Sequence, residues 1–141
     1  MTQARTVVLD NEAVQALADP SHRKHRRVMA VVEAVAARNL RRTGSVRLVV
    51  PTAVRVEAGW NRQAAGAAAL NRLRVDDHPL DAGAADRAAD VRSSLAVSVA
   101  DAHLAAVLAV AAGPHAVVTS DAGDLRRVAE HLGVAVHVVA V

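Results

Sequence analysis

The acidic residues that stand out in this sequence follow apolar runs or lie at the start of a helical pattern. They are Asp10, Glu57, Asp101, Asp121 and Asp124. Asp10 ends one apolar run, Glu57 comes after a second, and Asp121 and Asp124 follow a third. Asp101 lies early in an Ala-rich segment. Each acid alone is compatible with an ordinary turn or helix-cap residue, so the information lies in the set.

Carboxylates that converge on one point repel each other, which raises some of their pKa values and destabilises the fold. A Mg²⁺ or Mn²⁺ ion removes this conflict, because both ions prefer oxygen ligands and bind phosphate oxygens. An ion held in this way orients a water molecule, lowers its pKa and stabilises charge on a scissile phosphate. The four acids Asp10, Glu57, Asp101 and Asp121 therefore predict metal-dependent phosphodiester chemistry without a covalent nucleophile.

Strand-like apolar runs alternate with helical patterns along the chain, which predicts right-handed crossovers and an α/β fold with a mostly parallel sheet. The expected strands cover residues 6–9, 47–50, 74–77, 115–118 and 134–139. The expected helices cover residues 12–17, 21–42, 64–73, 81–93, 98–111 and 124–131, together with one that carries Glu57. Ser21, Thr52, Asp81 and Ser98 are the expected N-caps, and Gly44 is expected to end the second helix.

This alternation places the acids at one edge of the sheet. In an open parallel sheet, ligands bind outside the carboxyl ends of the strands, near the point where strand order reverses. Asp10 and residues 119–124 directly follow strands, and Glu57 lies within about two helical turns of one. With Ser98 as N-cap, Asp101 is the third residue of its helix, where the free amides and the helix dipole stabilise an anion.

Length and composition indicate one domain over residues 1–141, large enough to bury a substantial core. Although 52% of the residues are hydrophobic, no apolar run approaches the roughly 18 residues that cross a bilayer. The start of the chain does not resemble a signal peptide, so we expect a cytoplasmic protein with no membrane partner. The absence of cysteine excludes disulfides and thiolate metal sites, and is compatible with a reducing compartment.

Arginine supplies nearly all of the positive charge, since Lys24 is the only lysine among 17 basic residues. The planar guanidinium suits phosphate oxygens, although codon bias in a GC-rich genome explains an arginine-rich composition equally well. The densest basic stretch, residues 23–27, is compatible with an RNA contact or with a solvated helix face. Arg55 and Arg62 lie nearer Glu57 in the sequence and are the better candidates for substrate binding.

Around the acids the chain resembles the PIN-domain family, in particular the VapC-like ribonuclease toxins of bacterial toxin–antitoxin pairs. The segments that carry the resemblance are residues 7–10, 49–60, 98–106 and 117–125. They include Leu9-Asp10, Glu57-Ala58-Gly59, Asp101-Ala102 and Thr119-Ser120-Asp121-Ala122-Gly123-Asp124. Each segment alone is weak, and their order in a chain of this length makes the set fairly specific.

The resemblance implies a three-layer α/β/α sandwich and a Mg²⁺- or Mn²⁺-dependent endoribonuclease, usually a homodimer with an antitoxin as partner. It also implies a role for each matching residue. Asp10, Glu57 and Asp101 would bind the metal, Asp121 would complete the cluster, Asp124 would support it, and Thr119 or Ser120 would hydrogen-bond a ligand or orient an acid.

One position departs from the family's pattern. The family usually has a small hydroxyl residue close behind its first acid, whereas Asn11 and Glu12 follow Asp10 here. Asn11 can substitute as a hydrogen-bonding group, and Glu12 adds a carboxylate near the site. The departure bears on metal coordination rather than on family membership.

The remaining polar and aromatic residues bear on which class of RNA the protein would bind. Trp60 is the only aromatic residue other than histidine, so base stacking contributes little, and a structured RNA such as tRNA fits better than a flexible single strand. We expect Trp60 to be a packing residue. His103 lies two residues from Asp101 on the same expected helix, so it points elsewhere and is expected to be structural.

Three alternatives to a nuclease were compared. A catalytically inactive PIN-like module that binds RNA or a protein would show the same motifs. A phosphorelay receiver would need a pair of acids at the first strand and a lysine near the last, and Lys24 does not meet that requirement. A dinucleotide-binding domain would need a G-x-G-x-x-G string after the first strand, which the sequence lacks.

Overall fold

Five short parallel strands form one sheet in the computed structural model, which describes residues 4–41 and 46–141. The strands are β1 (Thr6–Leu9), β2 (Arg47–Pro51), β3 (Asp76–His78), β4 (His115–Thr119) and β5 (Val136–Ala140). Their order across the sheet is β3-β2-β1-β4-β5, with every neighbouring pair parallel. The chain therefore leaves β1 toward one side of the sheet and returns to the other, so the order reverses between β1 and β4.

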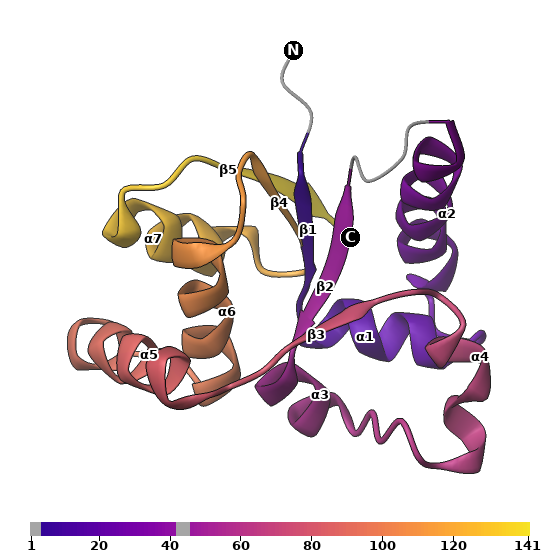
Figure 1. Ribbon diagram of the computed structural model, residues 1–141, viewed down its shortest axis with the longest axis horizontal. Coiled ribbons are helices and arrows are strands. Elements are labelled where there is room, and N and C mark those ends of the chain that lie inside the picture. The colour runs from indigo at the N-terminus through magenta and orange to yellow at the C-terminus, as the bar shows by residue number, and fades with distance from the viewer. Residues whose placement is uncertain (1–3, 42–45) are drawn as a thin grey trace.

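Seven α-helices and one short 3-10 helix connect these strands in the described ranges. They are α1 (Asn11–Ala18), α2 (His25–Arg41), α3 (Thr52–Ala58), η1 (Ala65–Ala67), α4 (Ala68–Asn71), α5 (Ala82–Ser94), α6 (Val99–Val110) and α7 (Ala122–Leu132). Figure 1 shows α1 to α4 on one side of the sheet and α5 to α7 on the other, with the carboxyl end of β1 at the lower edge.

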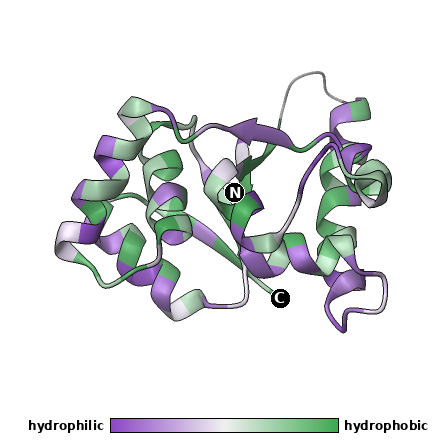
Figure 2. Ribbon diagram, turned by 90° about the horizontal axis from the view of Figure 1, so that it is seen from below, coloured by the Kyte–Doolittle hydropathy of each residue, from purple (hydrophilic) through white to green (hydrophobic). Residues whose placement is uncertain are grey.

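Both faces of the central strands are buried, which is why these strands are continuously apolar rather than alternating. Val7 and Leu9 of β1 pack with α1 and α2, whereas Val8 packs with Leu104 and Leu108 of α6. Seen from below, the hydrophobic residues gather along the sheet and on the helix faces turned toward it (Figure 2). The predicted α/β/α sandwich is therefore confirmed.

Helix α6 is buried on two sides because α5 packs on its outer face. Ala88 and Val91 of α5 contact a stripe of small residues on α6 that includes Ala102 and Ala105. Small side chains let the two helices approach closely. The burial explains why α6 is almost entirely apolar after Asp101.

Two of the four predicted N-caps are confirmed, and two are wrong. Asp81 and Ser98 cap α5 and α6 as expected. Ser21 does not begin α2, which starts at His25, because its backbone and hydroxyl both donate to Asp19 in the preceding turn. Thr52 is the first residue inside α3, and its hydroxyl accepts the Leu80 backbone N–H instead.

Element boundaries differ from the predictions elsewhere as well. The single helix expected over residues 64–73 is a 3-10 turn followed by the short α4. Helix α7 begins two residues earlier than expected because Asp121, rather than Asp124, is its N-cap. Gly44 and Arg42, the predicted end of the second helix, lie outside the described residues.

No single helix in the described part of the chain is long and apolar enough to cross a membrane. Helices α5 and α6 meet the length and composition test only as a pair, and they are bent by 115°.

Candidate active site

The first acid of the site, Asp10, follows β1 and caps α1. Its Oδ1 accepts the Ala13 N–H at 2.9 Å, and its own N–H donates to the Val118 carbonyl of the neighbouring β4. The cap fixes the carboxylate at the carboxyl end of β1, and the bond to β4 fixes it next to the point where strand order reverses. The same carboxylate is also hydrogen-bonded by the loop after β4.

The loop after β4 holds a second acid in the same manner. Asp121 caps α7 by accepting the Asp124 N–H at 3.0 Å, and its own N–H donates to the Thr119 hydroxyl. The Thr119 side chain is buried, and both it and the Ser120 backbone hydrogen-bond to Asp10. Thr119 therefore ties the two acid-bearing loops together, which is consistent with the predicted supporting role.

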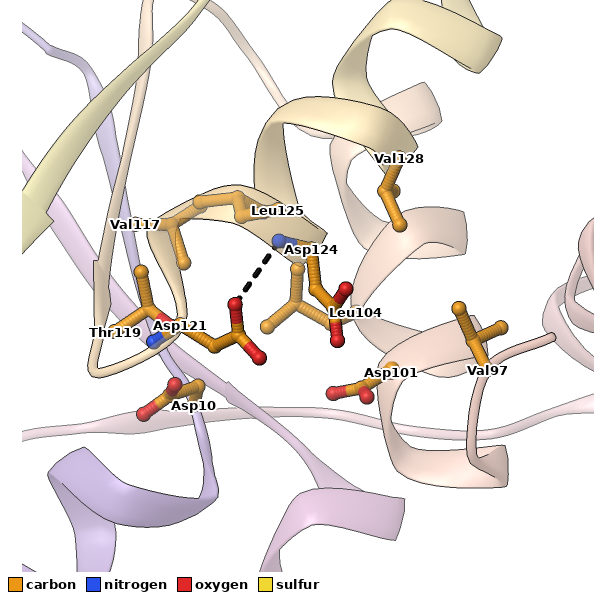
Figure 3. A pocket seen from close by; sticks show the side chains of 10 residues that line it. All are labelled: Asp10, Val97, Asp101, Leu104, Val117, Thr119, Asp121, Asp124, Leu125 and Val128. Atoms are coloured by element: carbon orange, nitrogen blue, oxygen red, sulfur yellow. Dashed lines mark hydrogen bonds between the residues drawn. The ribbon is translucent and has the colours of Figure 1, made fainter. Parts of the chain in front are cut away.

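The third acid, Asp101, comes from α6. It is the third residue of that helix, and its N–H donates to the Ser98 hydroxyl at 3.1 Å. The carboxylate lies on the side of α6 that faces the loop after β4 (Figure 3). At this position the negative charges of Asp124 and Asp121 act on it. Three elements thus converge on one edge of the sheet.

These acids line one cavity of about 60 Å³, which has room for several water molecules. Its polar residues are Asp10, Asp101, Thr119, Asp121 and Asp124. Its walls are apolar side chains from β4, α6, α7 and the segment before α6: Val97, Leu104, Val117, Leu125 and Val128. Figure 3 shows the carboxylates of Asp101, Asp121 and Asp124 turned toward one space, with Asp10 beside it below Asp121 and the cap of Asp121 drawn as a dashed line.

Burial and mutual repulsion perturb the two central acids. Burial raises the pKa of Asp10, and the Asp101 charge adds to that rise, against the hydrogen bonds from Thr119 and two backbone amides that lower it. Burial likewise raises the pKa of Asp101, with further rises from Asp124 and Asp121. The site therefore holds negative charge at a cost, and a cation would relieve that cost.

Asp124 is placed differently from the other acids of the cavity. Its carboxylate accepts a hydrogen bond from Arg127 one turn later, and this contact, together with the bond to Asp121, lowers the pKa of Asp124. Arg127 was not singled out from the sequence, although its spacing of three residues from Asp124 is the usual spacing of a helical ion pair. The negative charge of Asp124 is thus balanced by Arg127 of the same helix.

The chemistry of the donors fits a hard divalent cation, since the polar wall of the cavity consists of carboxylate and hydroxyl oxygens. Within residues 4–41 and 46–141, however, no three acidic or histidine side chains stand close enough together to hold one ion by themselves. Mg²⁺ usually retains several water ligands and needs only one or two carboxylates, so the two observations are compatible.

Glu57 does not line this cavity. It is exposed on α3 and borders a separate hollow with Thr52, Ala53 and the first turn of α6, including Ser98 and Val99. The two hollows are neighbours, because the turn of α6 that carries Asp101 takes part in both. The structure brings the other three predicted metal-binding acids together and leaves Glu57 at the margin.

The two predicted substrate-binding arginines are bound to the protein itself. Arg55 and Arg62 both pair with Asp77, at 2.8 and 2.9 Å, and both guanidinium groups lie over the Trp60 ring. Burial tends to raise the pKa of Asp77, but the two arginines outweigh it and hold the pKa below its usual value. Trp60 is buried, as predicted for a packing residue, and its indole N–H donates to Asn71.

The residues that depart from the family's pattern point away from the cavity. Asn11 accepts a hydrogen bond from Gln15 on the same helix. Glu12 pairs with His22 and Lys24, at 3.4 and 3.5 Å, so it anchors the turn before α2. Neither side chain lines the cavity of the acids. The basic stretch that follows this turn presents exposed Arg23, Arg26 and Arg27.

No family model matches this chain, and no curated protein matches it. The solved structures do contain a similar fold. The chain is similar to a chain in the crystal structure of VapBC2 from Rickettsia felis bound to a DNA fragment from their promoter. The match has a TM-score of 0.62 and 12% sequence identity, and it covers 94% of this chain and 98% of the other. The agreement is one of fold, and it supports the PIN-like, VapC-like architecture predicted from the sequence.

Proposed function

We propose that this protein is a Mg²⁺- or Mn²⁺-dependent endoribonuclease, and that it is the toxin of a toxin–antitoxin pair. The observation that carries the proposal is the cavity that Asp10, Asp101 and Asp121 line at the reversal of strand order. Three carboxylates from three separate elements share a small space there, and two of them have raised pKa values.

One or two of the acids Asp10, Asp101 and Asp121 would contact the ion directly, and the remaining acids would contact it through bound water. Asp121 gives Oδ1 to its helix cap, whereas the Asp10 carboxylate is shared by its helix cap, Thr119 and the Ser120 backbone. The bound ion would polarise the scissile phosphate and lower the pKa of the attacking water. Glu57, on the adjacent helix, would contact the ion or the RNA from the margin of the cavity.

The protein's own residues prepare this site before substrate arrives. Thr119 holds the Asp10 and Asp121 loops in register, and Ser98 holds the first turn of α6 that carries Asp101. The apolar wall limits water to the polar side of the cavity. Arg127, bonded to Asp124, places a guanidinium near the acids, where it would reduce the repulsion felt by an RNA phosphate.

Similarity to a VapBC2 chain over nearly the full length of both chains supports the toxin assignment. It also supports a small antitoxin protein as partner. The homodimer as the active form and the cytoplasm as the location are parts of the proposal that rest on the sequence. A structured RNA such as tRNA is the proposed substrate.

The test is cleavage of a structured RNA by the purified protein with Mg²⁺ or Mn²⁺, and with EDTA. Asp10→Asn and Asp101→Asn should each reduce the cleavage rate by at least about 100-fold. Removing a group that only supports a metal ligand typically costs about 10- to 100-fold, and removing a ligand itself should cost no less. Asp81→Asn is the matched control, because Asp81 caps α5 through the same kind of bond without lining the cavity. Undiminished cleavage by folded Asp10→Asn and Asp101→Asn proteins would disprove the assignment.

A catalytically inactive module that binds RNA or a protein is the second candidate. It is favoured by the fact that no three acids of the described chain gather tightly enough to hold an ion unaided. An inactive module would form a defined complex with its partner in EDTA and would not cleave RNA with either metal ion.

A further inference from the structure

The helix that carries Glu57 begins in an unusual manner. Pro51 occupies the N-cap of α3, and its side chain has no acceptor for the free backbone N–H groups of the first turn. Thr52, which has a suitable hydroxyl, uses it to accept the Leu80 N–H. The cap that α3 requires must therefore come from outside the helix.

His103 of α6 supplies that cap. Its Nδ1 accepts the Ala53 N–H at 3.2 Å, across 50 positions of sequence. The imidazole is fully buried, and the His78 ring stands edge-on to it with 6.1 Å between ring centroids. A ring fixed on two sides in this way cannot rotate out of the contact without opening the core. Since Nδ1 is the acceptor, the ring is neutral with its proton on Nε2.

The same bond connects two of the predicted metal-binding acids. Asp101 and His103 are two residues apart on α6, so they point to different sides of the helix, one toward the cavity and the other toward α3. Ala53 and Glu57 are four residues apart on α3, so they lie on one face of that helix. Both line the hollow that also includes the first turn of α6.

We propose that His103 is a positioning residue, which caps α3 from α6 and thereby fixes the Glu57 carboxylate relative to Asp101. The consequence for catalysis rests on the proposed nuclease function, whereas the cap itself does not. Without this bond, the start of α3 would be held by the packing of Val54 and by the Thr52–Leu80 hydrogen bond, and the rotation of the helix about its axis would be less firmly fixed.

The test uses His103→Leu, which keeps a side chain of similar bulk without an acceptor, and His103→Asn, whose amide oxygen can take the place of Nδ1. His115→Leu is the matched control, because His115 is also buried but bonds the Ala111 carbonyl at the opposite edge of the sheet. Backbone amide exchange by NMR is measured on all four proteins without metal, and RNA cleavage is measured with Mn²⁺.

The Ala53 amide should be protected in the wild type and should exchange about 10-fold faster in His103→Leu, with protection partly restored in His103→Asn. In the wild type, the ring nitrogens of His103 should show the tautomer protonated at Nε2, a signature that requires no variant. Cleavage should fall about 10- to 100-fold in kcat for His103→Leu, with KM little changed and with partial recovery in His103→Asn. His115→Leu should leave the Ala53 amide and kcat as they are.

An Ala53 amide that is unprotected in the wild type, or equally protected in a folded His103→Leu, overturns the proposal. So does a folded His103→Leu with wild-type kcat, provided that the wild type cleaves RNA. If the wild type cleaves nothing while the Ala53 results are as expected, the nuclease function fails and the cap stands. The two ideas can therefore fail separately.

Discussion

At the scale of single residues, the carboxylates of the cavity each perform two tasks. Asp10 and Asp121 each close the first turn of a helix and also line the cavity. Helix capping alone would place such an acid in solvent, where its pKa is low. Here the Asp10 carboxyl is enclosed and its pKa is raised, which a cap does not require.

The raised pKa of Asp10 predicts how stability depends on pH. Without metal, the folded protein binds more protons than the unfolded chain as the pH rises through the ordinary value of 3.8 toward the folded pKa. The charged carboxylate therefore destabilises the fold increasingly over that interval and fully above it. Asp10→Asn retains a capping oxygen and lacks the charge.

We expect Asp10→Asn to be more stable than the wild type at pH 7 in metal-free buffer, with the difference shrinking toward pH 3. Urea unfolding followed by circular dichroism at both pH values measures it. Asp81→Asn, which changes an equivalent cap outside the cavity, is measured as the control. A wild type that is the more stable protein at pH 7 would contradict the expectation.

Arg62 has a structural duty that its position in the sequence does not reveal. Its guanidinium contacts Asp77, donates to the Val75 carbonyl at 2.7 Å and lies 4.2 Å from the centre of the Trp60 ring. We expect Arg62→Ala to lower the free energy of unfolding by about 1–2 kcal/mol, because several partly buried contacts to one charged group are lost together. Arg26→Ala, an exposed arginine of α2, should change it by less than about 0.5 kcal/mol in the same urea titration.

At the scale of elements, the sequence predicts what local rules decide. The positions of β1, β2 and β4 follow from runs of buried residues rich in valine, and the Asp81 and Ser98 caps follow from their spacing to the helices behind them. The largely exposed Asp-Asp-His of β3 has no such run. Ser21 and Thr52 satisfy the same local rule, yet they bond to Asp19 and Leu80 instead. For Thr52 the competing partner lies 28 residues away, so only the folded chain reveals the outcome.

In the candidate site, too, some residue positions follow from local sequence and others depend on remote contacts. Asp10 and Asp121 come directly after strands, so the parallel sheet alone brings them together. Glu57 and Arg55 depend on the rotation of α3 about its axis and on a remote partner, Asp77, neither of which is encoded locally. A structural role for His103 is predicted from the sequence, but its bond to Ala53 is not, because that contact joins two helices that are far apart in sequence.

The end of α3 offers a test at this scale. Gly59 ends the helix with φ at +74°, whereas Gly66 in η1 has no positive φ, and a Cβ at either position would meet nothing within 4 Å. Gly59→Ala should therefore cost about 1–2 kcal/mol of stability through backbone strain alone. Gly66→Ala should be neutral or stabilise by up to about 1 kcal/mol. Equal thermal stabilities of the two variants would refute this explanation of how the helix ends.

At the scale of the whole molecule, the order of the strands places β1 and β4 at the centre of the sheet and the cavity at their carboxyl ends. Asp10, Asp101 and Asp121, which line this cavity, come from segments that are far apart in the sequence. Their convergence exists only when the sheet and the α6 layer are both formed. Binding of a metal ion in this cavity should therefore raise the stability of the whole fold.

We expect Mn²⁺ or Mg²⁺ to raise the melting temperature of the wild type, and EDTA to reverse the rise. An ion present at about 100 times its dissociation constant would add about 2.7 kcal/mol to the stability. The double variant Asp10→Asn/Asp101→Asn should gain little or nothing. Ca²⁺-free thermal scans over a range of metal concentrations measure the effect, and identical shifts in both proteins would place the ion elsewhere.

The double duty of the capping acids also has a genetic consequence. A single base change converts an aspartate codon into an asparagine codon, and asparagine caps a helix as well as aspartate does. At Asp10 or Asp121, such a mutation would remove one of the four carboxylate charges of the cavity and leave the helix cap in place. Under the proposed function, a lineage would thus lose the nuclease activity in one step and keep a folded protein.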